Sequence, residues 1–508
     1  MSEFMYDEII CPYCHGRFSH RDVHFRMETF FEDEEDLNDD GKNLDQIKRM
    51  PEGPAKARLQ EQVGQNYPFL CGPDEKYERF WADFGSTTEE AYGPDKKIPI
   101  HPSQLPVLNP SDSEDRLVLR RQRNSGSDSR DDYFIYDGDG MVMGLEDIHG
   151  KRTCRRLCPD CHNPLPTGYG KHETKFISVI GITQSGKTVY LSQLLKYMSK
   201  YVNFVDLTSY FTSDHEPSFI DSNPVKYGFD LPRPTVPEKL SQPMYYDLVQ
   251  NVAGDRLKTD TIVLYDIAGE NCASAKGMDT FGRFVTKSDG IILLLDPGQL
   301  GLAETVISDS GERSTNLITV FNTIHGAFQE QKSDGKLLVP VAVCISKSDM
   351  ISGILPEECQ GDITPVVHPS SGDPIRKFNA TAYNPLEKRL AEQMRSGTGQ
   401  EVHGALRRSY KHFNYFAFSA TGCAVEKLDG LSYPKAPPVP LRIAEPLLWL
   451  FYKFGYIGSD VPIRLPVQRD MPESVPETVK GPLPFMKKTV QRPLTDEEKE
   501  RYWYETRT

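Results

Sequence analysis

The sequence predicts an α/β protein with a doubly wound, mostly parallel sheet and a smaller cysteine-bearing unit before it. Short, continuous apolar runs alternate with helix-like segments between residues 174 and 456, the pattern of strands that helices cover on both faces. Two Cys-x-x-Cys pairs stand outside that region, at residues 11–14 and 158–161. The chain has 508 residues, which is more than one hydrophobic core usually organises.

The predicted strands are continuous apolar runs rather than alternating ones, as expected for strands buried on both faces. They are FISVI (176–180), TIVLYD (261–266), IILLLD (291–296), VAVCIS (341–346) and YFAFS (415–419).

Two helices stand out between and after these strands. Residues 314–330 carry an apolar stripe at the helical period. A last helix is predicted from about Pro446, which suits a first helical turn, to Phe454, with Gly455 as its stop. The stripe of the first helix consists of Leu317, Val320, Phe321, Ile324 and Phe328.

The two cysteine pairs predict a structural zinc site. Cys11-Pro-Tyr-Cys14 and Cys158-Pro-Asp-Cys161 each place two thiolates on one tight turn, the geometry that four-coordinate Zn²⁺ uses. A redox dithiol is the rival interpretation, but neither pair lies in a thioredoxin-like βαβ context. The sequence therefore predicts Zn²⁺ on these four cysteines. Nearby are Cys154, His15 and His162, which we expect to be bystanders once four thiolates are in place.

The domain boundaries follow from this reading. Residues 1–173 are predicted to form a zinc ribbon that a segment of about residues 15–153 interrupts, because Cys14 and Cys158 lie far apart. Residues 174–456 form the α/β domain, with insertions at about 205–245 and 351–410, and residues 457–508 form a Pro-rich tail that we expect to be extended.

Composition is uneven within the inserted segment. An acidic run, FEDEEDLNDDGKN (31–43), and a polar stretch from Asn109 to Tyr133 favour solvated or disordered loops. The aromatic segment YERFWADF (77–84) and the apolar PIHPSQLPVL (99–108) are expected to pack somewhere, in a fold that the sequence does not assign.

The charge balance and the apolar runs limit the partners and the compartment. There are 59 basic and 73 acidic residues, a net charge of −14, which argues against a general binder of nucleic-acid backbones. No run of 18 apolar residues is present, and the N-terminal MSEFMYDEII lacks the features of a secretory signal. We therefore expect a cytoplasmic protein with no membrane partner.

The segment GITQSGKT carries the strongest functional signal. Gly181-x-x-x-x-Gly186-Lys187-Thr188 follows a predicted strand and opens a predicted helix, which is the context that a phosphate-binding loop requires. The backbone N–H groups, including those of Gln184 and Ser185, would face the phosphates, and Lys187 would reach the β and γ oxygens. Thr188 would hold Mg²⁺. The alternative is a chance glycine-rich turn.

Asp266-Ile-Ala-Gly269-Glu270 closes the next long apolar strand. A carboxylate at this point, here Asp266, can contact Mg²⁺, commonly through a water. Gly269 can offer its N–H to a γ-phosphate. Alone, an aspartate at the end of a strand is ordinary; after a phosphate loop in the same sheet it becomes the metal-side partner.

Two further motifs predict the base. Asp349, in the SKSD motif at residues 346–349, can accept from guanine N1 and N2, a pattern that adenine does not offer, while the stem of Lys347 lies along the base. Ser419 and Ala420 end the last strand, where small residues let a backbone N–H approach the guanine O6. Solvated turns are the alternative for both, and ATP would then replace GTP.

With these four motifs in this order, the chain resembles a P-loop GTPase of the Ras-like and translation-factor type over about residues 174–456. The resemblance implies GTP or GDP with Mg²⁺, and switching between the two forms. Together with the cysteine-paired element ending CPDCHNPLP, the chain further resembles the bacterial double-GTPase group of regulated conflict operons. One phosphate loop is present, so the sequence does not predict two active GTPase units.

The chain departs from that family pattern in three places. Glu270 stands where a glutamine usually orients the attacking water, which implies hydrolysis that is slow, arranged differently or stimulated by a partner. Ser346 stands where an asparagine usually supports the phosphate loop. The threonine that closes on Mg²⁺ is not identified, because Thr208, Thr212 and Thr235 all remain candidates.

The leading hypothesis is a Mg²⁺-dependent GTP-hydrolysing switch, possessing a structural zinc and acting on protein partners through the zinc ribbon, the insertions or the switch regions. Two alternatives remain. One is a module that senses guanine nucleotide without turnover, which Glu270 favours. The other is a zinc-ribbon nucleic-acid binder with an accessory NTPase, for which CRRLC and LRRQR supply local positive charge.

Overall fold

The structure is a computed structural model, and it describes most of the chain. The acidic run 31–43, most of residues 99–108, Thr183 and Thr235 lie outside the described residues. The described residues are 8–27, 49–51, 53–56, 74–86, 107–147, 150–182, 184–213, 215–233, 239–252, 256–303, 317–328, 331–396, 399–466, 474–480 and 487–505.

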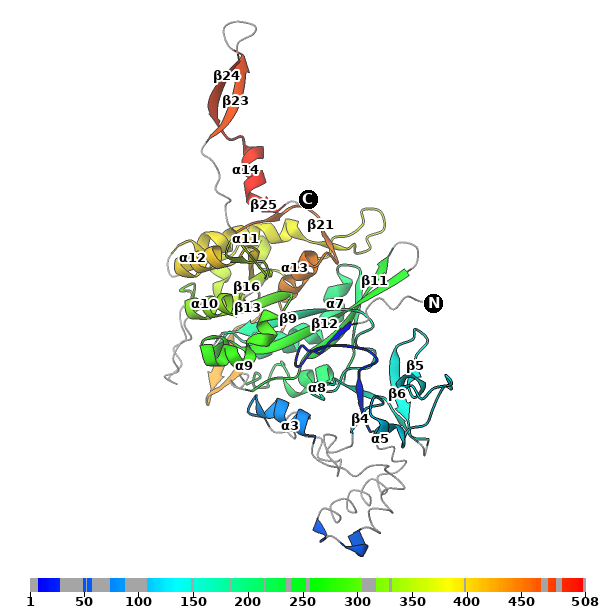
Figure 1. Ribbon diagram of the computed structural model, residues 1–508. Helices are drawn as coiled ribbons and strands as arrows, with labels where there is room; N and C mark the ends of the chain where they lie inside the picture. The colour runs from blue at the N-terminus through cyan, green and yellow to red at the C-terminus, as the bar shows by residue number, and fades with distance from the viewer. Residues whose placement is uncertain are drawn as a thin grey trace.

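A seven-stranded sheet forms the centre of the molecule (Figure 1). Its strand order is β10-β11-β12-β9-β13-β16-β18, and β11 runs antiparallel to both its neighbours while β12, β9, β13, β16 and β18 are parallel. All five predicted strands are therefore confirmed. The bounds are β9 (Glu173–Gly181), β10 (Leu207–Phe211), β11 (Met244–Val252), β12 (Arg256–Ala268), β13 (Gly290–Leu295), β16 (Val341–Ile345) and β18 (Phe413–Ala417).

Helices cover both faces of the sheet, as the apolar strands require. Side chains such as Ile177 and Leu264 face one core, and Ile180 and Val263 face the other. The first core includes α6 (Lys187–Lys196), α7 (Met198–Asn203) and α13 (Glu445–Lys453). The second core includes α9 (Ala275–Thr286), α10 (Leu317–Ala327) and α12 (Gly399–Ser409).

The chain changes direction at β9. From β9 it builds β10, β11 and β12 on one side, and it then returns to place β13 on the other side. In open α/β sheets, ligands bind outside the carboxyl ends of the strands at such a switch point. The topology therefore marks the end of β9, at Gly181, as the place to look for a site.

Both segments read as insertions carry elements of this domain. Residues 207–211 of the first form the edge strand β10, and α8 (His215–Ser222) packs beside α6 and β11. In the second, α11 (Ala380–Met394) lies along β18, where the hydroxyl of Tyr383 donates to the carbonyl oxygen of Tyr415 at 2.9 Å, and α12 follows it.

Short elements connect these layers. The 3₁₀-helix η3 (Gly269–Cys272) follows β12, and η4 (Ser348–Ile354) and η5 (Glu357–Cys359) follow β16. Two small hairpins pair β14 (Lys332–Ser333) with β15 (Lys336–Leu337) and β19 (Val425–Leu428) with β20 (Leu431–Pro434).

The N-terminal unit consists of short strands and one aromatic helix. Strand β3 pairs with both β4 and β8, which joins the start of the unit to its end. The elements are β1 (Glu8–Ile10), β2 (Arg17–Ser19), β3 (His24–Arg26), α3 (Glu75–Ala82), β4 (Val107–Leu108), α5 (Ser113–Arg116), η2 (Arg130–Asp132), β5 (Ile135–Tyr136), β6 (Val142–Glu146), β7 (Arg152–Thr153) and β8 (Arg155–Leu157).

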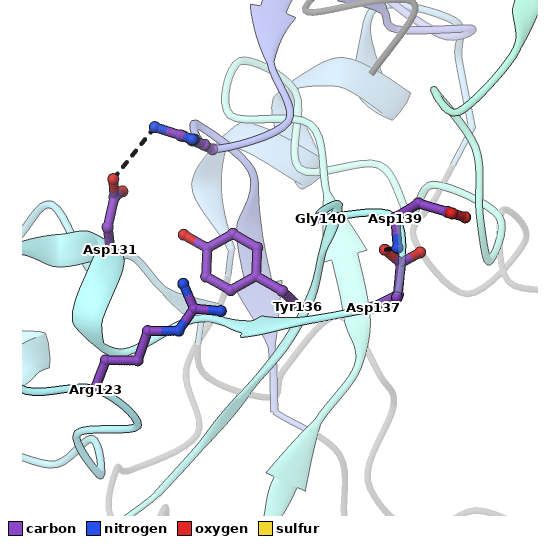
Figure 2. Close-up of a pocket in the computed structure, with 8 residues that line it drawn as sticks. Arg123, Asp131, Tyr136, Asp137, Asp139 and Gly140 are labelled. Carbon is purple, nitrogen blue, oxygen red and sulfur yellow. Dashed lines mark hydrogen bonds and ion pairs between the residues drawn. The ribbon is translucent and has the colours of Figure 1, made fainter. Parts of the chain in front are cut away.

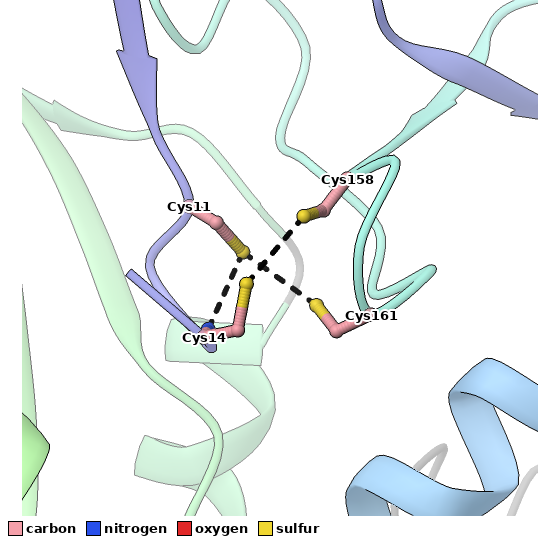
Figure 3. A group of neighbouring side chains, drawn as sticks. All are labelled: Cys11, Cys14, Cys158 and Cys161. Carbon is pink, nitrogen blue, oxygen red and sulfur yellow. Dashed lines mark hydrogen bonds between the residues drawn. The ribbon is translucent and has the colours of Figure 1, made fainter. Parts of the chain in front are cut away.

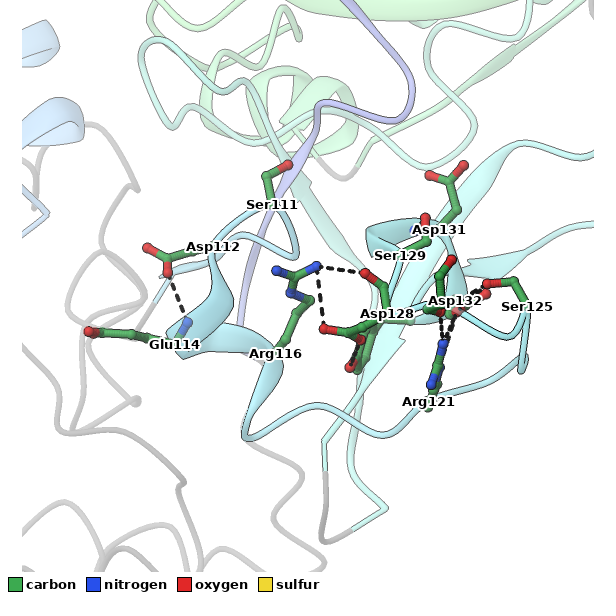
Figure 4. Close-up of polar contacts among 12 residues, drawn as sticks. Ser111, Asp112, Glu114, Arg116, Arg121, Ser125, Asp128, Ser129, Asp131 and Asp132 are labelled. Carbon is green, nitrogen blue, oxygen red and sulfur yellow. Dashed lines mark hydrogen bonds and ion pairs between the residues drawn. The ribbon is translucent and has the colours of Figure 1, made fainter.

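The polar stretch from Asn109 to Tyr133 is mostly solvated, as predicted, and polar contacts hold it together, although Leu119 and Tyr133 reach the core (Figure 4). The guanidinium of Arg121 pairs with the carboxylate of Asp132, and the hydroxyl of Ser125 donates to the same carboxylate at 2.8 Å. Asp132 is only 3% exposed. A buried carboxylate with two such donors fixes the loop without apolar burial.

The tail forms more structure than the predicted extended segment. Strands β21 (Gly458–Ser459) and β22 (Ile463–Arg464) pair with β17 (Lys377–Phe378) and β25 (Tyr504–Glu505). Strands β23 (Ser474–Lys480) and β24 (Lys487–Pro493) form an antiparallel hairpin, followed by α14 (Asp496–Trp503). In Figure 1 this hairpin extends away from the sheet rather than lying over it. Across the described residues, no helix has the length and apolar character to span a membrane.

Candidate functional site

The loop from Gly181 to Lys187 lies at the switch point of the sheet. It leaves β9 at Gly181, and α6 begins at Lys187. Gln184 and Gly186 have left-handed backbones, with φ of 66° and 73°, and the N–H of Ser185 donates to the carbonyl oxygen of Ile182 at 2.9 Å. Left-handed residues that alternate with right-handed ones can turn successive N–H groups toward one side and form an anion-binding concavity.

Two glycines are required by close backbone approach. A Cβ on Gly181 would lie 2.5 Å from Cβ of Lys187. A Cβ on Gly269 would lie 2.7 Å from the carbonyl oxygen of Gly181 and 2.9 Å from Cα of Ile182. Gly269 therefore packs directly on the phosphate-binding loop, which brings the end of β12 and the loop after β9 together.

Lys187 and Asp266 meet between these two segments. The ammonium of Lys187 forms an ion pair with the carboxylate of Asp266, and both residues are 7% exposed. Burial lowers the pKa of Lys187 to about 7, while the neighbouring carboxylate of Glu270 acts in the opposite direction. A buried ammonium of this kind needs anionic partners to remain charged, and a phosphate would be one more.

Thr188 and Glu270 complete this side of the site. Thr188 is the second residue of α6 and is 8% exposed, and Glu270 is half-buried at the start of η3. A Mg²⁺ ion prefers oxygen ligands and keeps several waters, so a hydroxyl and one carboxylate suit it. The oxygens of Thr188 and Asp266 fit that donor set.

Asp349 and Ser419 meet at the ends of β16 and β18. The hydroxyl of Ser419 donates to Oδ1 of Asp349 at 2.5 Å, and it accepts from the N–H of Gly422 at 2.8 Å. The N–H of Ser348 donates to the carbonyl oxygen of Phe418 at 2.9 Å, so the two loops are also joined through their backbones. Ala420, the next residue, is partly buried.

Ser346 and Lys347 are tied to β13 instead. The hydroxyl of Ser346 donates to the carbonyl oxygen of Leu295 at 3.0 Å, so it supports the neighbouring strand. The ammonium of Lys347 lies 2.6 Å from the carboxylate of Asp296, and its backbone is left-handed, with φ of 52°. These contacts attach the SKSD loop to the end of β13.

The phosphate loop and the Asp349–Ser419 pair share one edge of the sheet. Lys187 and Asp266 mark the carboxyl ends of β9 and β12, and Asp349 and Ser419 follow β16 and β18. Parallel strands present their carboxyl ends at the same edge, and neighbouring strands are about 4.8 Å apart. Two strand steps, or about 10 Å, therefore separate β9 from β16. One ligand with phosphates at one end and a flat base at the other can span that distance.

The four cysteines form a cluster in the N-terminal unit (Figure 3). The sulfurs of Cys11 and Cys161 are 3.7 Å apart, those of Cys14 and Cys158 are 3.6 Å apart, and all four lie within 4.8 Å of one another. Tetrahedral Zn²⁺ with Zn–S bonds of 2.3 Å requires sulfurs about 3.8 Å apart. The cluster fits a zinc ion.

Each pair lies on a turn that we call a knuckle, the first being residues 11–16 and the second residues 158–163. In both, the N–H of the histidine after the second cysteine donates to the carbonyl oxygen of the first cysteine, at 2.9 Å for His15 and 3.0 Å for His162. Both histidines have left-handed backbones, with φ of 59° and 52°. Two segments far apart in sequence thus adopt the same local geometry.

Donors surround the sulfurs. Backbone N–H groups donate to the sulfurs of Cys11, Cys14 and Cys158 at 3.4 to 3.5 Å. The fourth sulfur, of Cys161, accepts from the side-chain amide of Asn163 at 3.3 Å. N–H donors stabilise thiolates, and thiolates are the form of cysteine that binds a metal cation.

Helix α3 packs beside both knuckles, and the sequence did not assign it a place. The indole N–H of Trp81 donates to Oδ1 of Asn163 at 2.9 Å, and the ring of Tyr13 packs against Phe80 and Trp81, with centroids 6.0 and 6.2 Å away. The aromatic residues of segment 77–84 predicted that this segment packs somewhere. Only the folded chain shows that it packs against the second knuckle.

The three spare ligand candidates are outside the cluster. Cys154 is exposed. The ring of His162 lies 2.8 Å from Asp74 and 3.0 Å from His24, and Nε2 of His15 lies 3.1 Å from the hydroxyl of Tyr265. Both ring nitrogens of His162 and Nε2 of His15 are therefore engaged elsewhere, whereas Nδ1 of His15 is buried without a hydrogen bond among the described residues.

A cavity of about 470 Å³ lies in the N-terminal unit, away from the phosphate loop (Figure 2). The guanidinium of Arg123 stacks over the ring of Tyr136, 4.6 Å from its centroid, and Arg21 pairs with Asp131 at 3.3 Å. Lys171 pairs with Asp137. Arg21, Asp131 and Asp137 on its wall are thus engaged in ion pairs and Arg123 stacks on a ring, and we assign no ligand to the cavity.

Comparison with known proteins finds similarity among solved structures. The chain matches no protein-family model and no curated protein. Among solved structures it is similar to Sup35 complexed with GDP, at 10% identity and a TM-score of 0.20, and to Sup35 complexed with GMPPNP, at 11% identity and a TM-score of 0.21. Each match covers 49% of this chain and 38% of the other, so it spans well under half the length of those proteins.

Proposed function

We propose that the chain binds guanine nucleotide with Mg²⁺ and hydrolyses GTP, as a switch that acts on protein partners. One observation carries the proposal: Lys187 and Asp266 meet beside a left-handed, glycine-dependent loop at the switch point of the sheet, and Asp349 and Ser419 meet at the same edge. The first pair suits phosphates, and the second suits a base.

The phosphates would occupy the concavity of residues 181–188. Backbone N–H groups at the N-terminus of α6 would donate to the β-phosphate, and the ammonium of Lys187 would exchange part of its contact with Asp266 for phosphate oxygens. Mg²⁺ would be held by Thr188 and Asp266, and it would neutralise phosphate charge when bound. The low exposure of these residues strengthens each charge interaction.

The base would be read at the other end. The carboxylate of Asp349 would accept from N1 and N2 of guanine, and the hydrogen bond from Ser419 holds that carboxylate in one orientation. The backbone N–H of Ala420 would donate to O6. Adenine offers an acceptor where guanine offers its N1 donor, so it leaves the carboxylate without a partner.

Hydrolysis would take place beside Gly269 and Glu270. The N–H of Gly269 would donate to a γ-phosphate oxygen, and the carboxylate of Glu270 would accept a hydrogen bond from the attacking water. The water oxygen forms the new bond to phosphorus as the bond to the β–γ bridging oxygen breaks, and GDP leaves with that oxygen. A carboxylate repels the γ-phosphate where a neutral glutamine would not, so we expect slow turnover without a partner.

The carboxylate of Glu270 also favours a second function, that of a sensor that holds guanine nucleotide without turnover. Either function is compatible with the resemblance to bacterial conflict-system GTPases, and a role in cellular defence is part of the proposal. In both, the zinc would be structural, because four protein thiolates leave no open position for a substrate.

Single-turnover measurements test this proposal. The metal-loaded chain with radiolabelled GTP should release phosphate slowly, and Glu270→Gln should change that rate while leaving GDP affinity within about twofold. Retention of intact GTP over hours by both proteins would favour the sensor. Binding of ATP in preference to GTP, or of neither, would overturn the base assignment.

A further inference from the structure

The first knuckle lies directly on the central sheet. The hydroxyl of Tyr265 donates to the carbonyl oxygen of Pro12 at 2.8 Å, and it lies 3.1 Å from Nε2 of His15. The ring of His15 packs against Phe176 and Phe284, with centroids 5.4 and 5.5 Å away. Tyr265 is 2% exposed, so these contacts are shielded from water.

Tyr265 connects this contact to the phosphate loop, because Asp266 is the next residue of β12. Successive side chains of a strand point to opposite faces of the sheet. Tyr265 accordingly joins the core that contains Cys11, and Asp266 contacts Lys187 at the start of α6. Two neighbouring residues thus touch the metal-binding turn on one face and the phosphate-binding lysine on the other.

Helix α9 provides a second connection. It follows η3, which begins at Gly269, the glycine that packs on the phosphate loop. Its Phe284 touches the ring of His15, and Phe281 and Phe284 touch Phe84, with centroids 5.5 and 5.8 Å away. The segment after the phosphate site is therefore covered by residues of the metal-bearing unit.

The metal is what holds the first knuckle in shape. Its turn includes a left-handed histidine, a conformation that non-glycine residues adopt only when their surroundings impose it. The cluster contains no disulfide, so a bound metal would be the link that joins the sulfurs of the first knuckle to those of the second. Loss of a bound metal would release four thiols, three of them buried, and would loosen the turn that carries Pro12 and His15.

We propose that metal occupancy of the four-cysteine site controls the affinity of the nucleotide site, with Tyr265 as the positioning residue between them. The inference rests on the proposed guanine-nucleotide function and adds its regulation. Coupling between two sites is reciprocal, so bound nucleotide should also slow the release of the metal. The expected effect is about tenfold in each direction, within the usual range of such couplings.

Tyr265→Phe tests the connection because it removes only the hydroxyl. A matched control exists in Tyr169, whose hydroxyl donates at 2.8 Å to the carbonyl oxygen of Ile10 beside the first knuckle, but which lies outside β12. Full-length wild type, Tyr265→Phe and Tyr169→Phe would be loaded with Zn²⁺. The affinity for a fluorescent GDP analogue and the rate of zinc transfer to a colorimetric chelator would then be measured, the latter with and without GDP.

We expect removal of zinc to weaken GDP binding by wild type about tenfold, and GDP to slow zinc transfer in wild type and Tyr169→Phe. Tyr265→Phe should retain one zinc per chain, bind GDP several-fold more weakly and show zinc transfer that ignores GDP. If the metal-free chain unfolds, the GDP affinity and the zinc-transfer rates of the zinc-loaded variants still test the coupling. Equal behaviour of the two variants, or GDP affinity that ignores zinc in a folded chain, overturns the coupling alone. A zinc-loaded wild type that binds no guanine nucleotide overturns the proposed function itself.

Discussion

Ser419 donates its hydroxyl hydrogen to Oδ1 of Asp349 across 2.5 Å, although 70 positions separate the two residues in sequence. The bond joins the loops after β16 and β18 at the edge where the sheet ends. It holds the carboxylate of Asp349 in one orientation, and both carboxylate oxygens keep acceptor sites for a ligand. The proposed base specificity therefore depends on this pair rather than on one aspartate.

Asp349→Asn should exchange the preference for guanine with one for xanthine. The amide donates where the carboxylate accepts, and xanthine carries an acceptor in place of the guanine amino group. We expect GDP affinity to fall about 100-fold, as for the loss of two charge-assisted hydrogen bonds. Competition between GDP and XDP measures this, with the exposed Asp373→Asn as control. Unchanged competition would remove Asp349 from the base site.

Lys187→Ala should abolish phosphate binding and also destabilise the free protein. The variant leaves Asp266 buried without its cation, a change that typically costs about 3–5 kcal/mol. GDP affinity should fall at least 100-fold. Isothermal calorimetry and chemical denaturation measure the two effects. Lys196→Ala, an exposed lysine at the other end of α6, should change neither.

Asn163→Ala should weaken zinc binding about 10- to 100-fold, the usual effect of removing a partner of a metal ligand. The variant loses the N–H donor to the sulfur of Cys161, and it leaves the indole N–H of Trp81 buried without its acceptor. Competition with a chelator of known affinity gives the zinc constant. Asn124→Ala, in the exposed polar stretch, serves as control, and equal constants for the two variants would show that Asn163 does not support the site.

Acid should destabilise the fold through His403. Burial lowers the pKa of His403 to about 4, and its Nδ1 lies 2.8 Å from the hydroxyl of Tyr415. Between pH 6.5 and 4 the unfolded chain binds the proton and the folded chain does not, so stability falls as the pH falls. The contribution is about 1–2 kcal/mol after allowance for partial solvent access.

His403→Gln keeps a hydrogen-bonding group without a titrating one, so its stability should decline less on acidification than that of wild type. Urea denaturation at pH 7, 5.5 and 4 measures the difference. The exposed His368→Gln should follow wild type at each pH. A parallel decline in all three proteins would assign the acid sensitivity to other groups.

Much of the central sheet could be predicted because its inner strands are uninterrupted apolar runs. Residues 291–295 are apolar without interruption, and only a strand or helix buried on both sides tolerates that. Strand β10 gave no such signal, since Thr208 and Ser209 interrupt its apolar residues at a sheet edge. Strand β12 also begins at Arg256, five residues before the predicted start, because its backbone pairs with β11 there.

The sequence motifs predicted which residues could bind a nucleotide, but not the residues that hold those side chains in position. Motif order placed Lys187, Asp266 and Asp349 in one site hypothesis, because each follows an apolar strand. The contacts that position them come from residues with no motif, such as Asp296 beneath Lys347. Similarly, the spacing of four cysteines predicts a metal site, but a single sequence does not show that the indole of Trp81 bonds to Asn163 beside them.

The separation of the two knuckles has a consequence for biosynthesis. Cys14 emerges from the ribosome well before Cys158, since 143 residues lie between them. During that interval a nascent chain can offer only two of the four clustered cysteines, and the closing of so long a loop carries an entropic cost that the second pair must offset. A metal site that needs all four cysteines could therefore close only when the segment that leads into β9 has been made.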